Sequence, residues 1–353
     1  MVTRIAVVLP LREHFTLRKS GAVALSARDF ALQSRFREGV TVLGAGICEY
    51  ADVPYRRVDL RPSWWRRERT SYALAVAQSV RRVGYEAIEI QNRPYLVKRL
   101  RAWLPERRLA LHLHNDPQTM DGSRSVRERR LLLARLDAVY CVSAFVRGQF
   151  LDGIDDDEGK TVVVYNGVAR NAPTAPREKI VAYTGRVIEI KGVAQLAEAF
   201  MRAAPDMPGW RLVIAGEDKQ GLLARWRGEP RIETLGQVSH AEAMALYARA
   251  EIAAVPSLWQ EPFGRAAAEA LASGCAVIGT EQGGLAEVLS GAAEIVDARD
   301  IAGFAQRLVR VASDEALRRD LQARAVARSA RFDIRETTKA LDEARARLLR
   351  IAG

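Results

Sequence analysis

The sequence predicts an α/β fold with two Rossmann-like domains, and three observations support this prediction. The chain has 353 residues, enough for two domains that each bury a substantial hydrophobic core. Short runs rich in Val, Ile and Leu alternate with longer segments of helical period, which is typical of parallel sheets covered by helices. Two such series are separated by RNAPTAPREK (170–179), which contains two prolines, lacks apolar periodicity and has the composition of a linker.

The first series predicts an N-terminal domain over residues 1–169. Strands are expected at the apolar runs 5–10, 40–46, 55–60, 87–92, 109–115, 138–143 and 162–168. Helices are expected between most of these runs, for example at 23–37, 70–82 and 123–135. This alternation is the pattern of βα units in a parallel sheet.

The second series starts after the linker, so the second domain is expected to begin at residue 170. Its strands are expected at 180–185, 210–217, 232–236, 252–257, 276–281 and 293–297. Helices are expected from about 191, at 241–250 and from about 263. The tail from about 300 has a helical period throughout.

The composition is that of a globular protein, with 48% hydrophobic and 27% charged residues. No run of about 18 apolar residues occurs, and the N-terminal residues MVTRIAVVLP lead directly into a predicted strand rather than resembling a signal peptide. The three cysteines are far apart and outside any metal-binding spacing. These features predict reduced thiols in a cytoplasmic protein.

The net charge of +11 is concentrated in the first half of the chain. Residues 1–165 carry 28 Lys and Arg against 19 Asp and Glu. The densest stretch is RPSWWRRERT (61–70), where Trp64 and Trp65 lie among four arginines. Such a surface could contact nucleic acid, an acidic substrate or the anionic inner leaflet of a membrane. The alternative is an ordinary solvated helix face.

The functional residues are expected in the loops between strands and helices. Ligands of parallel sheets bind beyond the carboxyl ends of the strands, where helix N-termini point at them. After the first strand of the second domain comes GRVIEIKG (185–192). It places Arg186 and Lys191 around a helix start, where two cations and the helix dipole suit a diphosphate. The alternative is a pair of surface cations.

Two glutamates frame the stretch EPFGRAAAE (261–269). If the helix begins at Pro262 or Phe263, the eight-residue separation between Glu261 and Glu269 is about 2.2 turns, and the acids could contact opposite ends of one elongated ligand. The alternatives are a first-turn acid favoured by the dipole and a solvent-exposed helix acid.

The next predicted strand is followed by a pair of glycines. In GTEQGGLAEVL, Gly283 and Gly284 immediately precede another helix. We expect them to offer free backbone amides that can hold an anion at the same edge of the sheet.

These motifs make the chain resemble family 4 of the retaining nucleotide-sugar glycosyltransferases, which have the GT-B fold. The motifs are GRVIEIKG, LVIAGE, ETLGQVSHAE, VPSLWQEPFGRAAAEALASG, GTEQGGLAE and YNGV, and the resemblance covers essentially the whole chain. It implies two Rossmann-like domains, 1–169 and 170–333, that face each other across a cleft. It also implies a C-terminal helix, 334–353, that crosses back to the first domain.

The resemblance implies roles for individual residues of the second domain. Arg186 and Lys191 match the pair that grips the donor diphosphate. Glu269 matches the acid that accepts hydrogen bonds from the ribose hydroxyls, and Glu261 the acid beside the hydroxyls of the transferred sugar. The other positions expected to bind the donor are Gly236, Gln237 and Val238 at the base, and Pro262, Phe263, Gly264, Gly283, Gly284 and Leu285 around the sugar and phosphates.

The first domain is expected to contribute a histidine. In LHLHNDP, His114 matches a family histidine next to the reaction centre, so the residues expected in catalysis are Glu261, His114, Arg186 and Lys191. The neighbouring Asn115 and Asp116 are compatible with acceptor or sugar contacts. His112, on the other face of the strand, is expected to be buried packing.

The loop after the first strand departs from the family. Ser20, Gly21 and Ala22 stand at the helix start where a pair of glycines is often seen. Their backbone could still donate hydrogen bonds to a phosphate or to the acceptor. With one glycine fewer, the backbone approaches a ligand less closely.

The acidic run DDDE (155–158) resembles the metal-binding motif of the other major glycosyltransferase fold. It falls between a predicted helix and a predicted strand, far in sequence from the diphosphate loops. We therefore interpret it as a solvated turn and expect no metal, because Arg186 and Lys191 already supply the counter-charge.

The resemblance implies a retaining, metal-independent glycosyltransferase without a cofactor. Its co-substrate would be a nucleotide diphosphate sugar, with UDP favoured, and its acceptor a glycan or a lipid-linked sugar in lipopolysaccharide or surface polysaccharide assembly. The basic first half suits peripheral contact with the inner face of the cytoplasmic membrane. One alternative is a nucleotide-sugar epimerase of the same fold. The other is a nucleic-acid-binding protein, which we do not expect because the basic residues follow no known readout motif.

Overall fold

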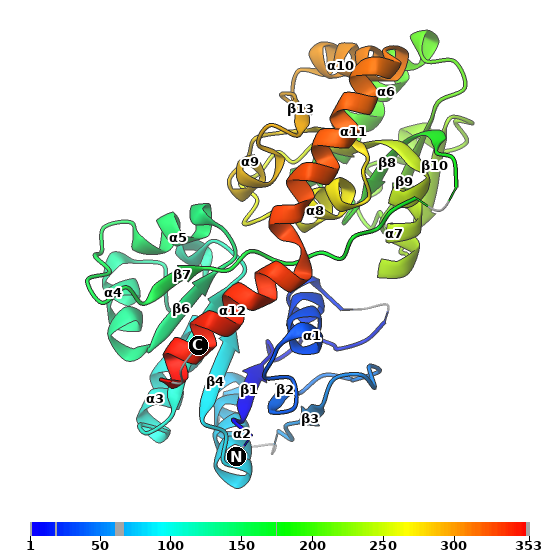
Figure 1. The fold of residues 1–353 in the computed structure, drawn as a ribbon. Helices are drawn as coiled ribbons and strands as arrows, with labels where there is room; N and C mark the ends of the chain where they lie inside the picture. The colour runs from blue at the N-terminus through cyan, green and yellow to red at the C-terminus, as the bar shows by residue number, and fades with distance from the viewer. Residues whose placement is uncertain (1, 18–19, 61–66, 174, 351–353) are drawn as a thin grey trace. The chain divides into compact units, whose positions relative to one another are not determined.

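The computed structural model describes residues 2–17, 20–60, 67–173 and 175–350. They form two compact units, each built on one parallel sheet (Figure 1). The first unit combines Met1–Gly167 with Ile334–Gly353, and the second is Val168–Asp333. Trp64 and Trp65 of the predicted basic patch lie outside the described residues.

The first unit contains a seven-stranded sheet in the order β3-β2-β1-β4-β5-β6-β7. All its neighbouring strands are parallel, and β1, β4 and β6 are buried along their whole length. This burial on both faces explains why these runs are mostly apolar in the sequence. The strands are β1 Ile5–Val8, β2 Val40–Gly44, β3 Tyr55–Arg57, β4 Ala87–Gln91, β5 Arg108–Leu113, β6 Ala138–Cys141 and β7 Thr161–Val163.

The helices of the first unit begin and end at residues suited to those positions. A capping box of Ser125 and Glu128 starts α4, and Gly84, with φ of 79°, ends α2. The helices are α1 Ala22–Gln33, α2 Glu68–Val83, α3 Val97–Trp103, α4 Val126–Arg135, α5 Ala144–Leu151 and α12 Ile334–Leu349, with short 3₁₀ helices η1 Pro94–Leu96 and η2 Pro117–Thr119.

The second unit contains a six-stranded parallel sheet in the order β10-β9-β8-β11-β12-β13. Its strands are β8 Glu178–Thr184, β9 Arg211–Ala215, β10 Ile232–Gly236, β11 Ala250–Val255, β12 Ala276–Gly279 and β13 Ala293–Ile295. Its helices are α6 Val193–Ala203, α7 His240–Arg249, α8 Arg265–Ala272, α9 Gly284–Leu289, α10 Ile301–Ser313 and α11 Glu315–Ser329, with 3₁₀ helices η3 Glu189–Lys191, η4 Ala204–Asp206, η5 Ala224–Trp226 and η6 Ala330–Phe332.

Amphipathic helices complete the core of the second unit. Helix α10 packs on α6, and α11 packs on α8. The apolar faces of α6 and α10 bring Phe200 and Phe304 into one buried cluster with Trp210. The removal of this apolar area from water is the main force that stabilises the unit.

The last helix belongs to the first unit and is fixed there by buried charges. Arg345 of α12 donates two hydrogen bonds to Glu89 in the middle of β4, Nε to Oε1 at 2.7 Å and Nη2 to Oε2 at 2.8 Å. The exposed fractions of these side chains are 2% and 1%. Asp342, one turn earlier, lies 3.2 Å from Nη1 of the same guanidinium. A buried charge is tolerated only when it is paired and fully hydrogen-bonded, which is the arrangement here.

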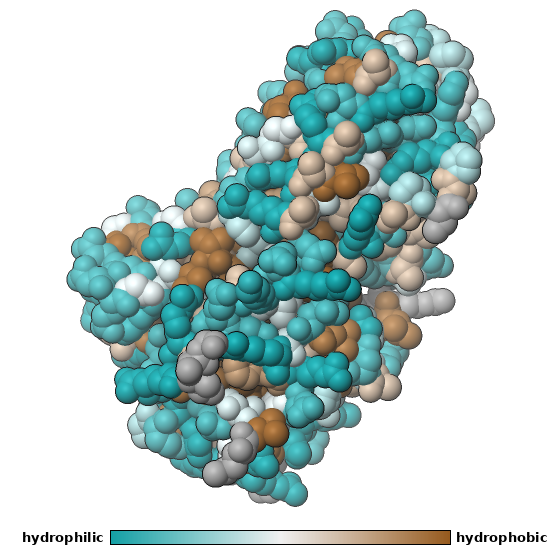
Figure 2. Space-filling model, in the orientation of Figure 1, coloured by the Kyte–Doolittle hydropathy of each residue, from teal (hydrophilic) through white to brown (hydrophobic). Residues whose placement is uncertain are grey.

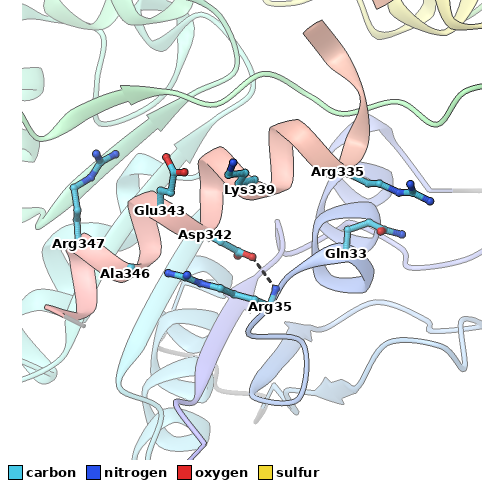
Figure 3. A pocket seen from close by; sticks show the side chains of 8 residues that line it. All are labelled: Gln33, Arg35, Arg335, Lys339, Asp342, Glu343, Ala346 and Arg347. Carbon is cyan, nitrogen blue, oxygen red and sulfur yellow. Dashed lines mark hydrogen bonds between the residues drawn. The ribbon is translucent and has the colours of Figure 1, made fainter. Parts of the chain in front are cut away.

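Asp342 also joins α12 to the end of α1. Its Oδ1 accepts a hydrogen bond from the Ser34 hydroxyl at 2.7 Å, and its Oδ2 accepts one from the backbone amide of Arg35 at 2.7 Å. Figure 3 shows this second contact, with the side chain of Asp342 directed from α12 towards Arg35. Helix α12 therefore packs on the sheet and on α1 together.

The face of the molecule seen in Figure 2 is mostly hydrophilic, with hydrophobic residues in small groups. Scattered exposed apolar side chains of this kind are normal for globular proteins. Among the described helices, none combines the length and the apolar character needed to cross a membrane.

Replacing Arg345 by Met tests the role of the buried charges. We expect Arg345→Met to lower the free energy of unfolding of the first unit by about 4 kcal/mol, because Glu89 is left as a buried carboxylate without a cation. Glu89→Gln should lower the free energy of unfolding by less, because Asp342 still pairs with Arg345. Urea denaturation followed by circular dichroism measures both.

The matched control is Arg347→Met, which removes an exposed arginine from the same helix and should change stability by less than about 0.5 kcal/mol. The double variant Glu89→Leu/Arg345→Met should recover much of the loss, because no charge of the pair remains buried. An Arg345→Met protein as stable as the Arg347→Met protein would contradict a stabilising role for the pair.

Candidate functional site

Two loops at the carboxyl ends of β8 and β11 carry the predicted diphosphate residues. The chain leaves β8 through Gly185 and Arg186, forms η3, and enters α6 at Gly192. Gly192 has φ of 68°, and a Cβ there would lie 2.0 Å from the carbonyl oxygen of Pro256. Only glycine permits this approach. It packs the loop that ends in Lys191 directly against the loop that follows β11.

Lys191 meets Glu261 across this contact. Its Nζ lies 2.5 Å from Oε1 of Glu261, and the same oxygen accepts a hydrogen bond from the Ser257 hydroxyl. The ammonium is also 5.4 Å from the centre of the Trp259 ring, within cation–π distance. Both contacts to Glu261 use Oε1, so no described residue bonds its Oε2. The carboxylate is thus held through one oxygen and can accept from a ligand through the other.

Arg186 lies at the same strand end and is exposed. Its backbone carbonyl accepts a hydrogen bond from the Tyr183 hydroxyl at 2.8 Å. Burial raises the pKa of Tyr183 and the charge of Glu261 raises it further, so the hydroxyl stays a donor at neutral pH. No carboxylate in the described part of the chain lies within ion-pair distance of the Arg186 guanidinium. The guanidinium therefore presents a full positive charge near the Lys191 and Glu261 pair.

The expected position of Glu261 at the N-terminus of the helix is wrong. Helix α8 begins at Arg265, because Gly264 has φ of 95° and interrupts the helical backbone. Glu261 lies before this break and forms an isolated β-bridge with Gly283. The predicted separation of about two turns from Glu269 therefore does not apply, since only Glu269 is on the helix.

The amide of Gly284 has a different role from the one we expected. The amide of Gly284 donates to the carbonyl oxygen of Glu261 at 2.7 Å, so it is not free for an anion. A Cβ at Gly284 would lie 2.3 Å from the carbonyl oxygen of Pro262, and one at Gly283 would lie 2.6 Å from that of Glu261. The glycines allow the loop after β12 to hold the backbone around Glu261 in place.

Glu269 is buried on α8 and bonded by the side chains of His240 and Arg265. Its Oε1 accepts from Nε2 of His240 at 2.8 Å and from Nε of Arg265 at 2.8 Å. Burial alone raises the pKa of Glu269, but Arg265 and His240 outweigh it, so the pKa lies below its usual range. The carboxylate is ionised at neutral pH. No described residue bonds its Oε2, which can accept from a ligand.

The loop expected to pack against the base lies between β10 and α7. Gly236 has φ of 65° and ends β10. Gln237 is exposed and Val238 is half-buried. Ser239 then caps α7, with a capping box to Glu242, which fixes His240 at the first helical position. The loop expected to pack against the base is therefore followed closely by His240, which bonds Glu269.

Three of the residues expected around the sugar and phosphates pack inside the unit. Phe263 is buried with its ring 5.5 Å from that of Phe332. Leu285 is buried, and a Cβ at Gly264 would lie 2.7 Å from its side chain. Pro262 is buried beside them. Only their backbone can face a ligand.

In the first unit, His114 is buried directly after β5. Its Nε2 donates to Oε1 of Gln91 at 2.8 Å, and its backbone amide donates to Oδ1 of Asn92 at 3.1 Å. Its ring stacks on that of His112 at 4.3 Å. His112 is buried as expected, but the expectation that it lies on the other face from His114 is wrong, because residues two apart in extended chain share a face and the two rings stack. Burial together with the charge of His114 lowers the pKa of His112 well below the usual range.

The two residues after His114 differ from each other. Asn115 is exposed. Asp116 accepts from the amide of Gln118 at 2.8 Å and thereby caps η2. The structure therefore gives Asp116 a local role in starting that helix.

The loop before α1 is engaged by its own side chains. Gly21 is the N-cap and Ala22 the first residue of α1. The amide of Gly21 donates to Oε1 of Glu13 at 2.8 Å, and the Ser20 hydroxyl donates to the carbonyl oxygen of Thr16 at 2.7 Å. Burial raises the pKa of Glu13, which the Gly21 hydrogen bond partly offsets. The amide of Gly21, which we expected to bind a phosphate or the acceptor, therefore already donates to Glu13.

The acidic run 155–158 forms a turn. Asp156 accepts from the amides of Lys160 at 2.8 Å and Thr161 at 2.9 Å. Across the described residues, no group of three or more His, Cys, Asp or Glu side chains is placed to hold a metal ion.

The structure thus brings together Lys191, Glu261 and the glycine loop. It adds four partners that the sequence did not single out: Ser257, Trp259, His240 and Arg265. The sequence signal for His240 is the capping box SHAE, which fixes where α7 begins. The signal for Arg265 is its i, i+4 spacing from Glu269.

The comparisons with known proteins point to one family. Residues 178–314, which lie within the second unit, match the family "Glycosyl transferases group 1". The glycogen synthase of Mycobacterium tuberculosis is 32% identical over 200 residues, which are 52% of this chain and 48% of that protein. The chain thus matches about half the length of that relative. The predicted resemblance to glycosyltransferases is confirmed.

Solved structures share the fold of the whole chain. The Anabaena protein HepE in complex with UDP and glucose superposes with a TM-score of 0.79 at 18% identity, over 98% of this chain and 99% of that one. The sucrose-phosphate synthase of Thermosynechococcus elongatus superposes with a TM-score of 0.79 at 20% identity, over 99% of each chain. At these identities the similarity establishes the fold, and the predicted GT-B fold is confirmed.

The lowered pKa of Glu269 predicts a pH-dependent contribution to stability. A carboxyl group whose folded pKa lies below the unfolded value stabilises the fold above that value, 4.5, and the contribution is lost as the pH falls through the folded pKa. Glu269→Gln should lower the free energy of unfolding by about 3 kcal/mol at pH 5 and above. This difference should shrink towards pH 3 in denaturant titrations.

Glu233→Gln is the control, because Glu233 is an exposed partner of Arg211 and should contribute less than about 1 kcal/mol. A Glu269→Gln effect of equal size at pH 3 and pH 5 would show that the loss does not come from the ionised carboxylate.

Proposed function

Since residues 178–314 match the group 1 glycosyl transferases and the whole chain has the GT-B fold, we propose that the protein is a retaining, metal-independent glycosyltransferase. Its donor is a nucleotide diphosphate sugar, with UDP favoured. The observation that carries the proposal is the Lys191 and Glu261 pair, 2.5 Å apart, at the same sheet edge as the ionised Glu269.

The donor diphosphate fits the positive charge after β8. Arg186 is exposed without a carboxylate partner among the described residues, and Lys191 is fixed between Glu261 and the Trp259 ring. Arginine binds two phosphate oxygens with its fork, while lysine supplies a compact charge. These two side chains would neutralise the diphosphate without a divalent ion. The Anabaena protein HepE, which shares the fold, was solved with UDP and glucose, which favours a UDP sugar.

The two glutamates fit the hydroxyl groups at the two ends of the donor. Each is held by the protein through Oε1, which leaves Oε2 for a ligand. Hydroxyl groups donate to ionised carboxylates in short, strong hydrogen bonds. Glu269 would accept from the ribose and Glu261 from the transferred sugar, and Gln237 and Val238 would lie at the base.

The transfer breaks the bond between the anomeric carbon and the diphosphate oxygen and forms one from that carbon to an acceptor hydroxyl. The leaving phosphate oxygen takes the proton of the acceptor, so the new bond forms on the same face. Arg186 and Lys191 stabilise the charge that develops on the leaving group, and such electrostatic stabilisation usually contributes most to catalysis. Glu261 and His114 position the sugar.

The acceptor is a glycan or a lipid-linked sugar, and the pathway is lipopolysaccharide or surface polysaccharide assembly. This part of the proposal rests on the excess positive charge of residues 1–165. A positive surface attracts acidic glycans and the anionic inner leaflet of the cytoplasmic membrane. Asn115 and the loop of Ser20 and Gly21 lie at the same sheet edge as His114, where an acceptor would bind.

Nucleotide binding tests the donor site. Thermal unfolding is followed with UDP, GDP and ADP, each with EDTA. We expect UDP to raise the melting temperature of the wild-type protein and binding to weaken at least about tenfold in Lys191→Ala, because a charge-assisted contact to the diphosphate is lost. Lys219→Ala, which removes a lysine of an exposed ion pair, is the control. An equal shift in Lys191→Ala would show that this lysine does not contribute to nucleotide binding.

Metal dependence tests the assignment of the counter-charge. Release of UDP from UDP-glucose should persist in EDTA within about twofold, and Glu261→Ala should reduce it at least about 100-fold while the protein stays folded. Complete loss in EDTA with rescue by Mg²⁺ or Mn²⁺ would contradict the metal-independent mechanism. Isomerised sugar formed from the donor alone would instead identify an epimerase.

A further inference from the structure

The first unit contains a pocket of 430 Å³ at the carboxyl edge of its sheet. The segments that follow β1, β4 and β5 and the start of α2 line it. Its charged side chains are Arg12, Glu68, Arg69, Arg93, Asp121 and Arg124. The volume falls in the range of small-molecule sites.

Among the described residues that line this pocket, four arginines and two carboxylates give an excess of two positive charges. Glu68 pairs with Arg12 at 3.2 Å, and Asp121 pairs with both Arg69 at 2.8 Å and Arg124 at 2.7 Å. Each carboxylate is therefore already bonded to an arginine. The described lining residues therefore do not balance the excess charge.

Arg93 is the lining arginine without an acid. Its Nη1 donates to the carbonyl oxygen of Asn92 at 2.7 Å, and no carboxylate among the described residues lies within ion-pair distance of it. The charge of Arg93 acts on Glu13, but that carboxylate bonds the amide of Gly21 at 2.8 Å. Arg93 thus keeps donors available for a ligand.

An unusual backbone conformation places Arg93. Asn92 has φ of 55°, in the left-handed region that costs energy for residues other than glycine. Its side chain holds this conformation by accepting from the amide of His114 at 3.1 Å. Strand β4 therefore ends in a fixed turn that sends the next residue, Arg93, into the pocket. The same hydrogen bond ties the pocket to His114.

The excess charge matches one chemical group well. A phosphate monoester carries about −1.5 to −2 charges at pH 7, which balances the two surplus positive charges. A carboxylate carries one charge and would leave the other unbalanced. Guanidinium forks bond phosphate oxygens in pairs, so several arginines can share one phosphate. The ring of Tyr95, with the Arg69 guanidinium 4.8 Å above it, adds an apolar wall.

We propose that this pocket binds a phosphate monoester carried by the acceptor, with Arg93 as its central ligand. The inference rests on the proposed function, because it takes the first unit to bind the acceptor. The phosphate comes from a soluble sugar phosphate or from a lipid headgroup, and the two sources share the same chemistry. His114 and Arg93 would then act on one molecule, since Asn92 links them.

Calorimetric titration tests the proposal in the full-length protein. The soluble probes are glucose 6-phosphate, glucuronate and glucose, and the lipid probe is a vesicle with phosphatidate. We expect glucose 6-phosphate or the phosphatidate vesicle to bind, and Arg93→Gln to weaken that binding at least about tenfold, as expected when a bidentate arginine contact is lost. Arg124→Gln, at an exposed position, should weaken it less. Arg130→Gln, an exposed arginine outside the pocket, should leave it unchanged.

The outcomes separate this proposal from the donor site. Equal binding by Arg93→Gln and wild type, glucuronate binding as tightly as glucose 6-phosphate, or no binding of either phosphate probe would overturn the pocket assignment. Binding of the vesicle alone, lost in Arg93→Gln, would assign the phosphate to a lipid. The UDP-induced shift in melting temperature should be the same in all variants. Its absence in the wild type would count against the donor site and leave the phosphate result standing.

Discussion

The first unit depends on the buried contact between Arg345 and Glu89. Removing these two charges from water costs several kcal/mol per ion, and the cost is offset only by the bidentate geometry and by the hydrogen bonds of Asp342 and Ser34. The pair joins residues 256 positions apart, so the last helix completes a domain that the first residues begin. Because the match of fork and carboxylate is specific, it also fixes the register of α12 on the sheet.

The same strand connects this contact to the functional edge of the sheet. Strand β4 carries Glu89 in its middle and Gln91 at its end, and Asn92 follows. Gln91 bonds the ring of His114, and Asn92 bonds its backbone and sends Arg93 into the pocket. A strand anchored by a buried ion pair thus positions both the histidine and the arginine. Rigid elements hold such groups more accurately than loops do.

The sequence predicted the order and type of the elements well, because the central strands of both sheets are buried and mostly apolar. It also placed Lys191 and Glu261 correctly in neighbouring loops at one sheet edge. It failed at Glu261 itself, because the left-handed Gly264 delays the helix, and at Gly284, whose amide bonds the chain. Partners distant in sequence, such as His240 for Glu269, follow from tertiary packing and leave no periodic signal.

The basic character of the first half gains a specific meaning from the pocket. Positive charges that are spread over a surface are screened by salt. Positive charges that are clustered in a pocket favour binding of an anionic ligand. Arg12, Arg69, Arg93 and Arg124 come from four separate segments, so composition alone could not show that they converge. In the second unit each buried glutamate is paired with a cation and keeps one oxygen for hydroxyl groups. In the pocket of the first unit, the described arginines outnumber the described carboxylates, and this excess of positive charge selects for an anion. The two units therefore differ in the chemistry they can recognise, which is consistent with the proposed donor, rich in hydroxyls, and the proposed acceptor, which carries a phosphate.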